Sequence, residues 1–132
     1  MTFTVIGLLD TLRTHLTEFD LPAPCSAQLT TSPSGPQMSL QIDRHDAHDT
    51  ACAVVAWADT LTQPTAEAWR VPSSNSVHLS ITGHLLDGVC LRIYGAVPVI
   101  EHGLGADLAP DAAITIPLAT LRHLATEGEV PA

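Results

Sequence analysis

The chain has 132 residues, of which 45% are hydrophobic and 14% charged, proportions that predict a single soluble domain spanning 1–132. Five basic residues, all arginine, face fourteen acidic ones, and the formal charge of −9 argues against generic binding to nucleic acid. No apolar run approaches the roughly 20 residues of a membrane span, and the N-terminus lacks the early basic region of a signal peptide. The three cysteines, odd in number and without a CxxC pair, favour a reducing cytoplasm.

Residues 3–19 show the period of an amphipathic helix, which Pro22 and Pro24 end. Apolar side chains recur at spacings of four and three and form one stripe. We expect this stripe to face the core: Val5, Leu9, Leu12, Leu16 and Phe19.

Residues 25–31 and 37–42 alternate as the two strands of a hairpin, joined by a turn rich in Ser, Pro and Gly. Hydroxyl and amide side chains fill one face, and apolar side chains fill the other. The side chains expected to face inward are Ala27, Leu29, Met38, Leu40 and Ile42.

Residues 50–61 predict a second helix, with Trp57 at the margin of its buried side and Pro64 as its stop. The buried side chains expected are Ala51, Val54, Val55, Ala58 and Leu61. Residues 66–71 then predict a strand, and pairing Val71 with Val77 would set Trp69 in the core.

Residues 77–97 carry the clearest pattern, two alternating strands around a tight turn. A two-residue turn at Asp87 and Gly88 would mix apolar and polar side chains on one face. A three-residue loop, 86–88, instead pairs Ile81 with Ile93 and keeps the faces distinct. We therefore expect the longer loop, with Gly88 in the left-handed conformation.

The last third of the chain is less regular. Residues 98–111 show no period, and a loop of this length suggests a lid or binding loop. Residues 113–116 predict a strand and 117–125 a helix with Leu118, Leu121 and Leu124 inward, while 127–132 predict a frayed tail. The predicted fold class is therefore α+β and two-layer, an antiparallel sheet with helices packed on one face, in the order α-β-β-α-β-β-β-β-α.

The densest group of potential metal ligands is DRHDAHD, residues 43–49. Imidazole and carboxylate groups bind Zn, Mn and Ni, so the candidate ligands of a divalent metal are His45, His48 and Asp49. The structural alternative is strong, because aspartates at a helix start cap the backbone and complement the helix dipole. Cys52, four residues after His48, is a candidate nucleophile, although such a cysteine more often fills a core position.

The polar face of the predicted sheet is a further candidate site. Apart from one arginine and two histidines, it consists of hydroxyls, amides and one tyrosine. A solvated face is normal for an antiparallel sheet, but weakly hydrated groups of this kind suit a protein interface better than bulk water. The predicted interface residues are His78, Ser80, Thr82, His84, Arg92 and Tyr94.

The sequence contains no P-loop, dinucleotide-binding fingerprint or GxSxG motif, so it indicates no common mechanism and no catalytic residue. It favours a small cytoplasmic adaptor or regulator that binds a protein partner or a second copy of itself. Two alternatives stay open. One is a metal-dependent or hydrolytic enzyme that uses residues 43–49, with 98–111 as its lid, and the other is an acidic inhibitor that mimics DNA.

Overall fold

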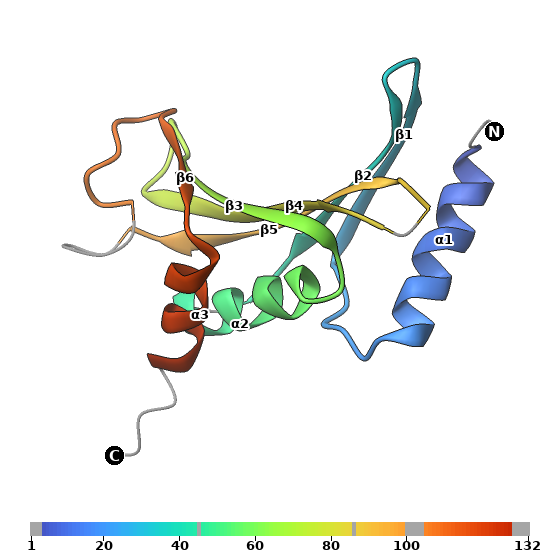
Figure 1. Ribbon diagram of the computed structural model, residues 1–132. Helices are drawn as coiled ribbons and strands as arrows, with labels where there is room; N and C mark the ends of the chain where they lie inside the picture. The colour runs from blue at the N-terminus through green and yellow to red at the C-terminus, as the bar shows by residue number, and fades with distance from the viewer. Residues whose placement is uncertain (1–3, 45, 86, 100–104, 128–132) are drawn as a thin grey trace.

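The computed structural model describes residues 4–44, 46–85, 87–99 and 105–127. Within them the chain forms an α+β fold whose elements follow the predicted order (Figure 1). None of the described helices combines the length and apolar character needed to cross a bilayer. The elements are α1 (Val5–Glu18), β1 (Ser26–Ser32), β2 (Gly35–Ile42), α2 (Ala47–Ala58), β3 (Thr62–Arg70), β4 (Ser76–His84), β5 (Cys90–Pro98), β6 (Ala113–Ile116) and α3 (Leu118–Glu127).

The six strands form one sheet in the order β1-β2-β5-β4-β3-β6. All neighbouring pairs are antiparallel except β2 and β5, which run parallel. The sheet is therefore mixed, and the prediction of a purely antiparallel sheet was wrong at this pair. The reason is the long connection through α2, β3 and β4, which returns the chain beside β2 in the same direction, as parallel neighbours require.

The β4–β5 hairpin has the predicted register, and its apolar face forms part of the core. Ile81 lies opposite Ile93 and Gly83 opposite Leu91, and Gly88 has a φ of 89°. Residue 86 of the predicted loop lies outside the described residues. The side chains of Leu79, Ile81, Leu91 and Ile93 are 0% exposed, because α2 packs against β4 and β5.

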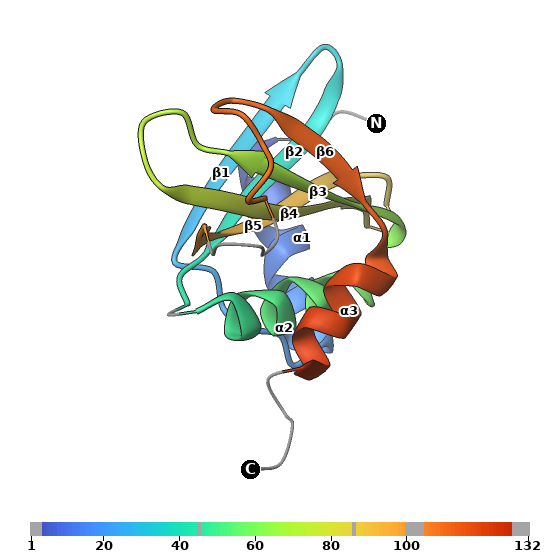
Figure 2. The same ribbon diagram turned by 90° about the vertical axis from the view of Figure 1, so that its left-hand side faces the viewer.

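Figure 2 shows α2 and α3 side by side on one side of the sheet. Helix α2 begins at Ala47, three residues earlier than predicted, because the Asp46 carboxylate caps it by accepting from the Asp49 N–H at 2.8 Å. It ends before Pro64, which lies in β3 beside a register irregularity instead of stopping the helix. Trp57, predicted at the helix margin, is 0% exposed.

Close packing of α2 on the sheet depends on a glycine in β5. A Cβ added at Gly95 would lie 2.7 Å from the Thr50 Cγ2 atom, closer than such atoms can approach. Both residues are buried, so the small size of Gly95 sets the distance between helix and strand.

Helix α1 lies beside β1 at one end of the molecule (Figure 1). Its fully or nearly buried side chains are Leu8, Leu12 and His15, whereas Val5 and Leu9 are 50% and 47% exposed. Phe19 is 36% exposed as well, so the predicted inward stripe was wrong at three of its five residues. A hydrophobic pattern does not count a polar residue such as His15 as inward, and this histidine packs against Trp57.

Two other side chains that were predicted to face the core, those of Trp69 and Ala27, do not lie in it. Trp69 is half-buried on the side away from α2, because β3 pairs Arg70, not Val71, with Val77. That shift of one residue turns Ala66 and Ala68 toward the helices and Trp69 away from them. Ala27 is exposed on β1, which is an edge strand of the sheet.

Candidate functional site

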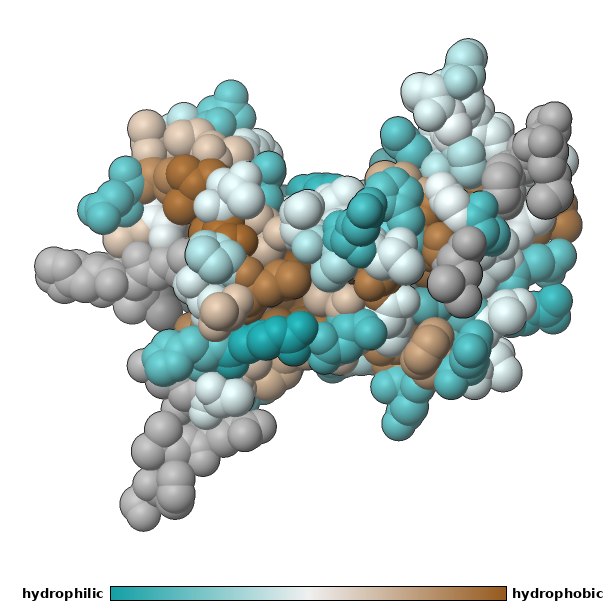
Figure 3. Space-filling view, viewed as in Figure 1, coloured by the Kyte–Doolittle hydropathy of each residue, from teal (hydrophilic) through white to brown (hydrophobic). Residues whose placement is uncertain are grey.

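The side of the sheet that faces away from α2 and α3 is a hollow surface. Figures 1 and 3 show a depression between the raised β1–β2 hairpin at one end and the β3–β4 turn with the start of β6 at the other. We call this surface the open face. Its side chains include the six predicted interface residues, together with Trp69, Glu67, Gln28, Gln37, Ser39 and Gln41.

Strand register brings the six predicted interface residues onto the same face. Thr82 lies opposite Arg92 and Ser80 opposite Tyr94, while His78 and His84 follow at intervals of two along β4. Ser80 is only 4% exposed, since its neighbours cover it, and its hydroxyl donates to the Glu67 carbonyl at 3.5 Å. The contact surface is therefore formed by the residues around Ser80.

Aromatic rings and one guanidinium group form a continuous row across three strands of the open face. The Trp69 and His78 ring centroids are 5.2 Å apart in an edge contact, and the His78 and Tyr94 centroids are 5.2 Å apart in a stacked one. The Arg92 Cζ atom lies 4.5 Å from the Tyr94 ring centroid, a cation–π contact. This row of four, from β3 through β4 to β5, is the ring ladder.

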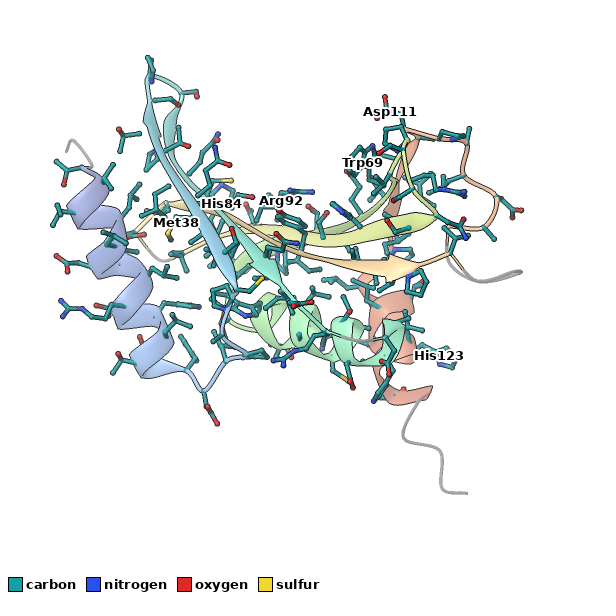
Figure 4. The ribbon with its side chains drawn as sticks, turned by 180° about the vertical axis from the view of Figure 1, so that it is seen from behind. Met38, Trp69, His84, Arg92, Asp111 and His123 are labelled. Carbon is teal, nitrogen blue, oxygen red and sulfur yellow. The ribbon has the colours of Figure 1, made fainter. Side chains whose placement is uncertain are left out.

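Hydrogen bonds hold two members of the ring ladder, Trp69 at one end and Tyr94 within it. The Trp69 indole N–H donates to the Asp111 carboxylate at 3.0 Å, and the two side chains meet at one raised end of the open face (Figure 4). The Tyr94 hydroxyl donates to the Gln41 side-chain oxygen at 3.5 Å. These contacts restrict the positions of the Trp69 and Tyr94 rings.

The charge of the ring ladder depends on the protonation of His78. Desolvation lowers the pKa of His78, and the nearby Arg92 guanidinium lowers it further. His78 is therefore neutral at pH 7, and Arg92 supplies the positive charge of the row.

A pocket of about 310 Å³ lies around Arg92, between the β1–β2 hairpin and β4. Figure 4 shows Arg92 on the open face between that hairpin and the end that holds Trp69. Among the residues that the structure describes, no carboxylate lines this pocket. Its walls are Gln28, Thr30, Gln37, Met38, Ser39, Thr82 and Cys90.

A larger hollow of about 600 Å³ lies between α1 and the turns that precede β3 and β5. We call it the acidic cleft, because four carboxylates line it: Asp10, Glu18, Asp59 and Asp87. Beside them His15 stacks on Trp57 with ring centroids 5.7 Å apart, and its Nε2 atom lies 2.8 Å from the Thr60 hydroxyl oxygen. Because that hydroxyl already donates to the Trp57 carbonyl, Nε2 carries the proton.

The predicted metal ligands do not form a site within the described residues. His45 lies outside them, and His48 and Asp49 stand in the first turn of α2. Among the described residues no group of three or more His, Cys, Asp or Glu side chains could hold a metal ion. The His48 ring instead lies 3.7 Å from the Cys52 thiol, which donates to the Ala125 carbonyl at 3.3 Å. The metal site stays a prediction.

The predicted lid, 98–111, falls partly outside the described residues, at 100–104. Its described second half is tied to β3: the Asp111 N–H donates to the Arg70 carbonyl at 2.9 Å, and the Arg70 side chain donates to the Leu108 carbonyl at 3.5 Å. The role of this segment as a lid stays a prediction.

Sequence reasoning missed Trp69 and Asp111 as members of the open face. The available signal was the small size of Ala66 and Ala68, which suits a strand surface close to helices. Asp111 carried no signal, because its contact with Trp69 spans 42 positions of sequence. Comparison of the chain with protein-family models, with curated proteins and with solved structures gives no match.

Proposed function

We propose that the protein is a small interaction module, an adaptor or regulator, that binds a segment of a partner protein on the open face. The proposal takes the fold as two layers, with helices covering one face of the sheet and the other left free for a partner. The observation that carries it is the ring ladder, Trp69–His78–Tyr94–Arg92, on an accessible concave surface. Tyrosine, tryptophan and arginine are the residue types that contribute most to protein interfaces.

The charge distribution supports the same proposal. A strand face that meets only water usually carries charged side chains, and this chain has fourteen acidic residues. Glu67 is the only one of them in the six strands. The acidic residues elsewhere keep the protein soluble, while the open face keeps the weakly hydrated groups that a partner can desolvate at low cost.

The shape of the open face favours a partner segment over a second copy. A two-fold interface must be self-complementary, and two hollow surfaces placed face to face touch only at their raised ends (Figures 1 and 3). A convex or extended segment of another protein fills the hollow.

The predicted homodimer fits another surface, the free edge of β1. This edge strand, Ser26–Ser32, contains no charged residue and no proline, the usual devices that stop edge strands from pairing. Pairing of two β1 strands around a two-fold axis centred on Leu29 would set Ala27 opposite Thr31 of the second copy. Such a dimer leaves both open faces accessible.

A photo-crosslinking amino acid tests the proposed partner site. We would place it at Thr82 on the open face and, as a matched control, at the exposed Thr120 of α3. The expected result is one covalent adduct with a protein from Thr82 and none from Thr120. The segment identified in the adduct, made as a peptide, should bind the purified protein, and Tyr94→Ala should weaken binding about tenfold or more. Equal adducts from both positions, or a peptide indifferent to Tyr94→Ala, would refute the proposal.

Light scattering after size-exclusion chromatography tests the dimer separately. We expect the mass of a dimer for the wild-type chain and of a monomer for the double variant A27K/T31K, which sets like charges opposite each other at the β1 edge. The matched control is A119K/T120K on the exposed surface of α3. A monomeric wild-type chain at high concentration would exclude the dimer and leave the partner site untouched.

A further inference from the structure

Building on the proposed function, we infer that the pocket around Arg92 binds a carboxylate of the partner segment, so that the open face selects an acidic sequence. The inference names the chemistry of the partner, which the proposed function leaves open. Three features support this inference: Arg92 lies over the Tyr94 ring, neutral hydrogen-bond donors surround it, and none of the described residues that line the pocket carries a negative charge.

Arg92 is held in a position to bind an anion. Its guanidinium lies over the Tyr94 ring with Cζ 4.5 Å from the centroid, and Tyr94 is itself held by His78 and Gln41. The N–H donors of a guanidinium lie along its edge, where two of them can pair with the two oxygens of one carboxylate. Among the described residues, Arg92 forms no ion pair and no hydrogen bond through these donors.

The walls of the pocket add donors without adding charge. Within the described chain, the side chains of Gln28, Thr30, Gln37 and Ser39 make no hydrogen bond to another residue. Amide N–H and hydroxyl groups can donate to the carboxylate oxygens that the guanidinium leaves unpaired. One cation surrounded by neutral donors matches the single charge of a carboxylate better than the double charge of a phosphate.

The net charge of −9 opposes any acidic partner at long range, but this opposition is screened. At physiological salt the Debye length is about 8 Å, so charges on the far side of α1 and α3 act weakly at the pocket. Three of the other four arginines use their guanidinium donors within the chain, and Arg44 is exposed and lines a different hollow together with Asp49. Arg13 and Arg122 pair with Asp10 and Asp59, and Arg70 bonds the Leu108 carbonyl and Asn75.

Nuclear magnetic resonance of the five arginine side chains tests the inference on the full-length protein. Each arginine gives one Nε–Hε signal, and the variant Arg92→Gln identifies that of Arg92. The probe is a capped peptide of alternating Glu and Ser, compared with its Gln–Ser counterpart and with inorganic phosphate. We expect the Glu peptide to shift the Arg92 signal in a saturable way, and the Gln peptide and phosphate to leave it in place.

Substitutions of Arg92 then test whether this side chain binds the Glu peptide. Arg92→Gln should weaken binding of the Glu peptide about tenfold, and Arg92→Lys less, because lysine keeps the charge but loses the paired donors. The matched control Arg13→Gln removes an exposed arginine and should leave binding unchanged. Equal shifts of all five signals, or a response to phosphate alone, would overturn the inference. The proposed function would survive that outcome, since the crosslink at Thr82 and its dependence on Tyr94 do not require Arg92 to bind a carboxylate.

Discussion

The acidic cleft and the Arg92 pocket are both hollows lined by polar groups, but they differ in how their charges are balanced. In the acidic cleft Asp10 and Asp59 pair with Arg13 and Arg122 at 2.9 and 2.6 Å, and Asp87 accepts a hydrogen bond from Thr11 at 3.2 Å. In the Arg92 pocket the one charged group has no such counterion among the described residues. A hollow whose polar groups bond within the chain serves the fold, whereas a fixed charge left without a partner invites a ligand.

The two tryptophans give the largest expected effect, because one belongs to each region. Trp57, beside the acidic cleft, is 0% exposed and donates to the Pro22 carbonyl at 3.0 Å, while Trp69 is half-buried on the open face. Trp57→Ala should lower the free energy of unfolding by about 3–5 kcal/mol through lost burial and a cavity. Trp69→Ala should lower it by about 1–2 kcal/mol, through one ring contact and one hydrogen bond.

Urea unfolding followed by circular dichroism measures both changes without relying on tryptophan fluorescence. If Trp57→Ala does not fold, Trp57→Phe keeps most of the buried ring and still reports a loss. An equal loss from the two alanine variants would contradict the division between a structural cleft and a binding face.

The pH dependence of stability should depend more on the histidine of the open face than on the histidine of the cleft. Burial lowers the pKa of His15, with partial opposition from Glu18 and Asp87, and burial and Arg92 lower that of His78. For both groups folding favours the neutral ring, so stability is full above the unfolded value near 6.5 and falls as the pH drops below it. His78→Gln should flatten this fall between pH 7.5 and 5, and His15→Gln should flatten it less, because Glu18 and Asp87 offset part of the effect of burial on the pKa of His15.

Unfolding of the wild-type chain and both variants at several pH values gives these slopes, with the exposed His123→Gln as control. A slope that is unchanged by His15→Gln would show that the histidine in the cleft gains as much from its acidic neighbours as it loses by burial.

The smallest expected effect concerns the ion pair at the rim of the cleft. Arg122 and Asp59 lie 2.6 Å apart, but their side chains are 48% and 52% exposed. Arg122→Gln should lower the free energy of unfolding by less than about 1 kcal/mol, and 0.5 M salt should reduce the difference. A larger loss that 0.5 M salt reverses would mean that the carboxylates of the cleft repel one another strongly once Arg122 is removed.

Alternation and periodicity predicted most of the elements and the register of the β4–β5 hairpin, because Ile81 and Ile93 can share a face in only one way. They failed for Trp69, because β3 pairs Arg70 with Val77 in place of the predicted Val71, and this shift of one residue turns Trp69 to the other face. Ala66 and Ala68 face inward there because α3 packs close to β3. The inward side of α1 was mistaken for a related reason, since His15 is polar by type and buried by its contact with Trp57.

The sequence by itself determined the order of helices and strands, the apolar side of the central hairpin and the residue types on its reverse, since these depend on spacing along the chain. Only the tertiary structure decided that β5 lies beside β2, that Trp69 joins His78, Tyr94 and Arg92, and that no described residue forms an ion pair with Arg92. These features arise from contacts between residues distant in sequence, and local patterns carry no information about which distant strand becomes a neighbour.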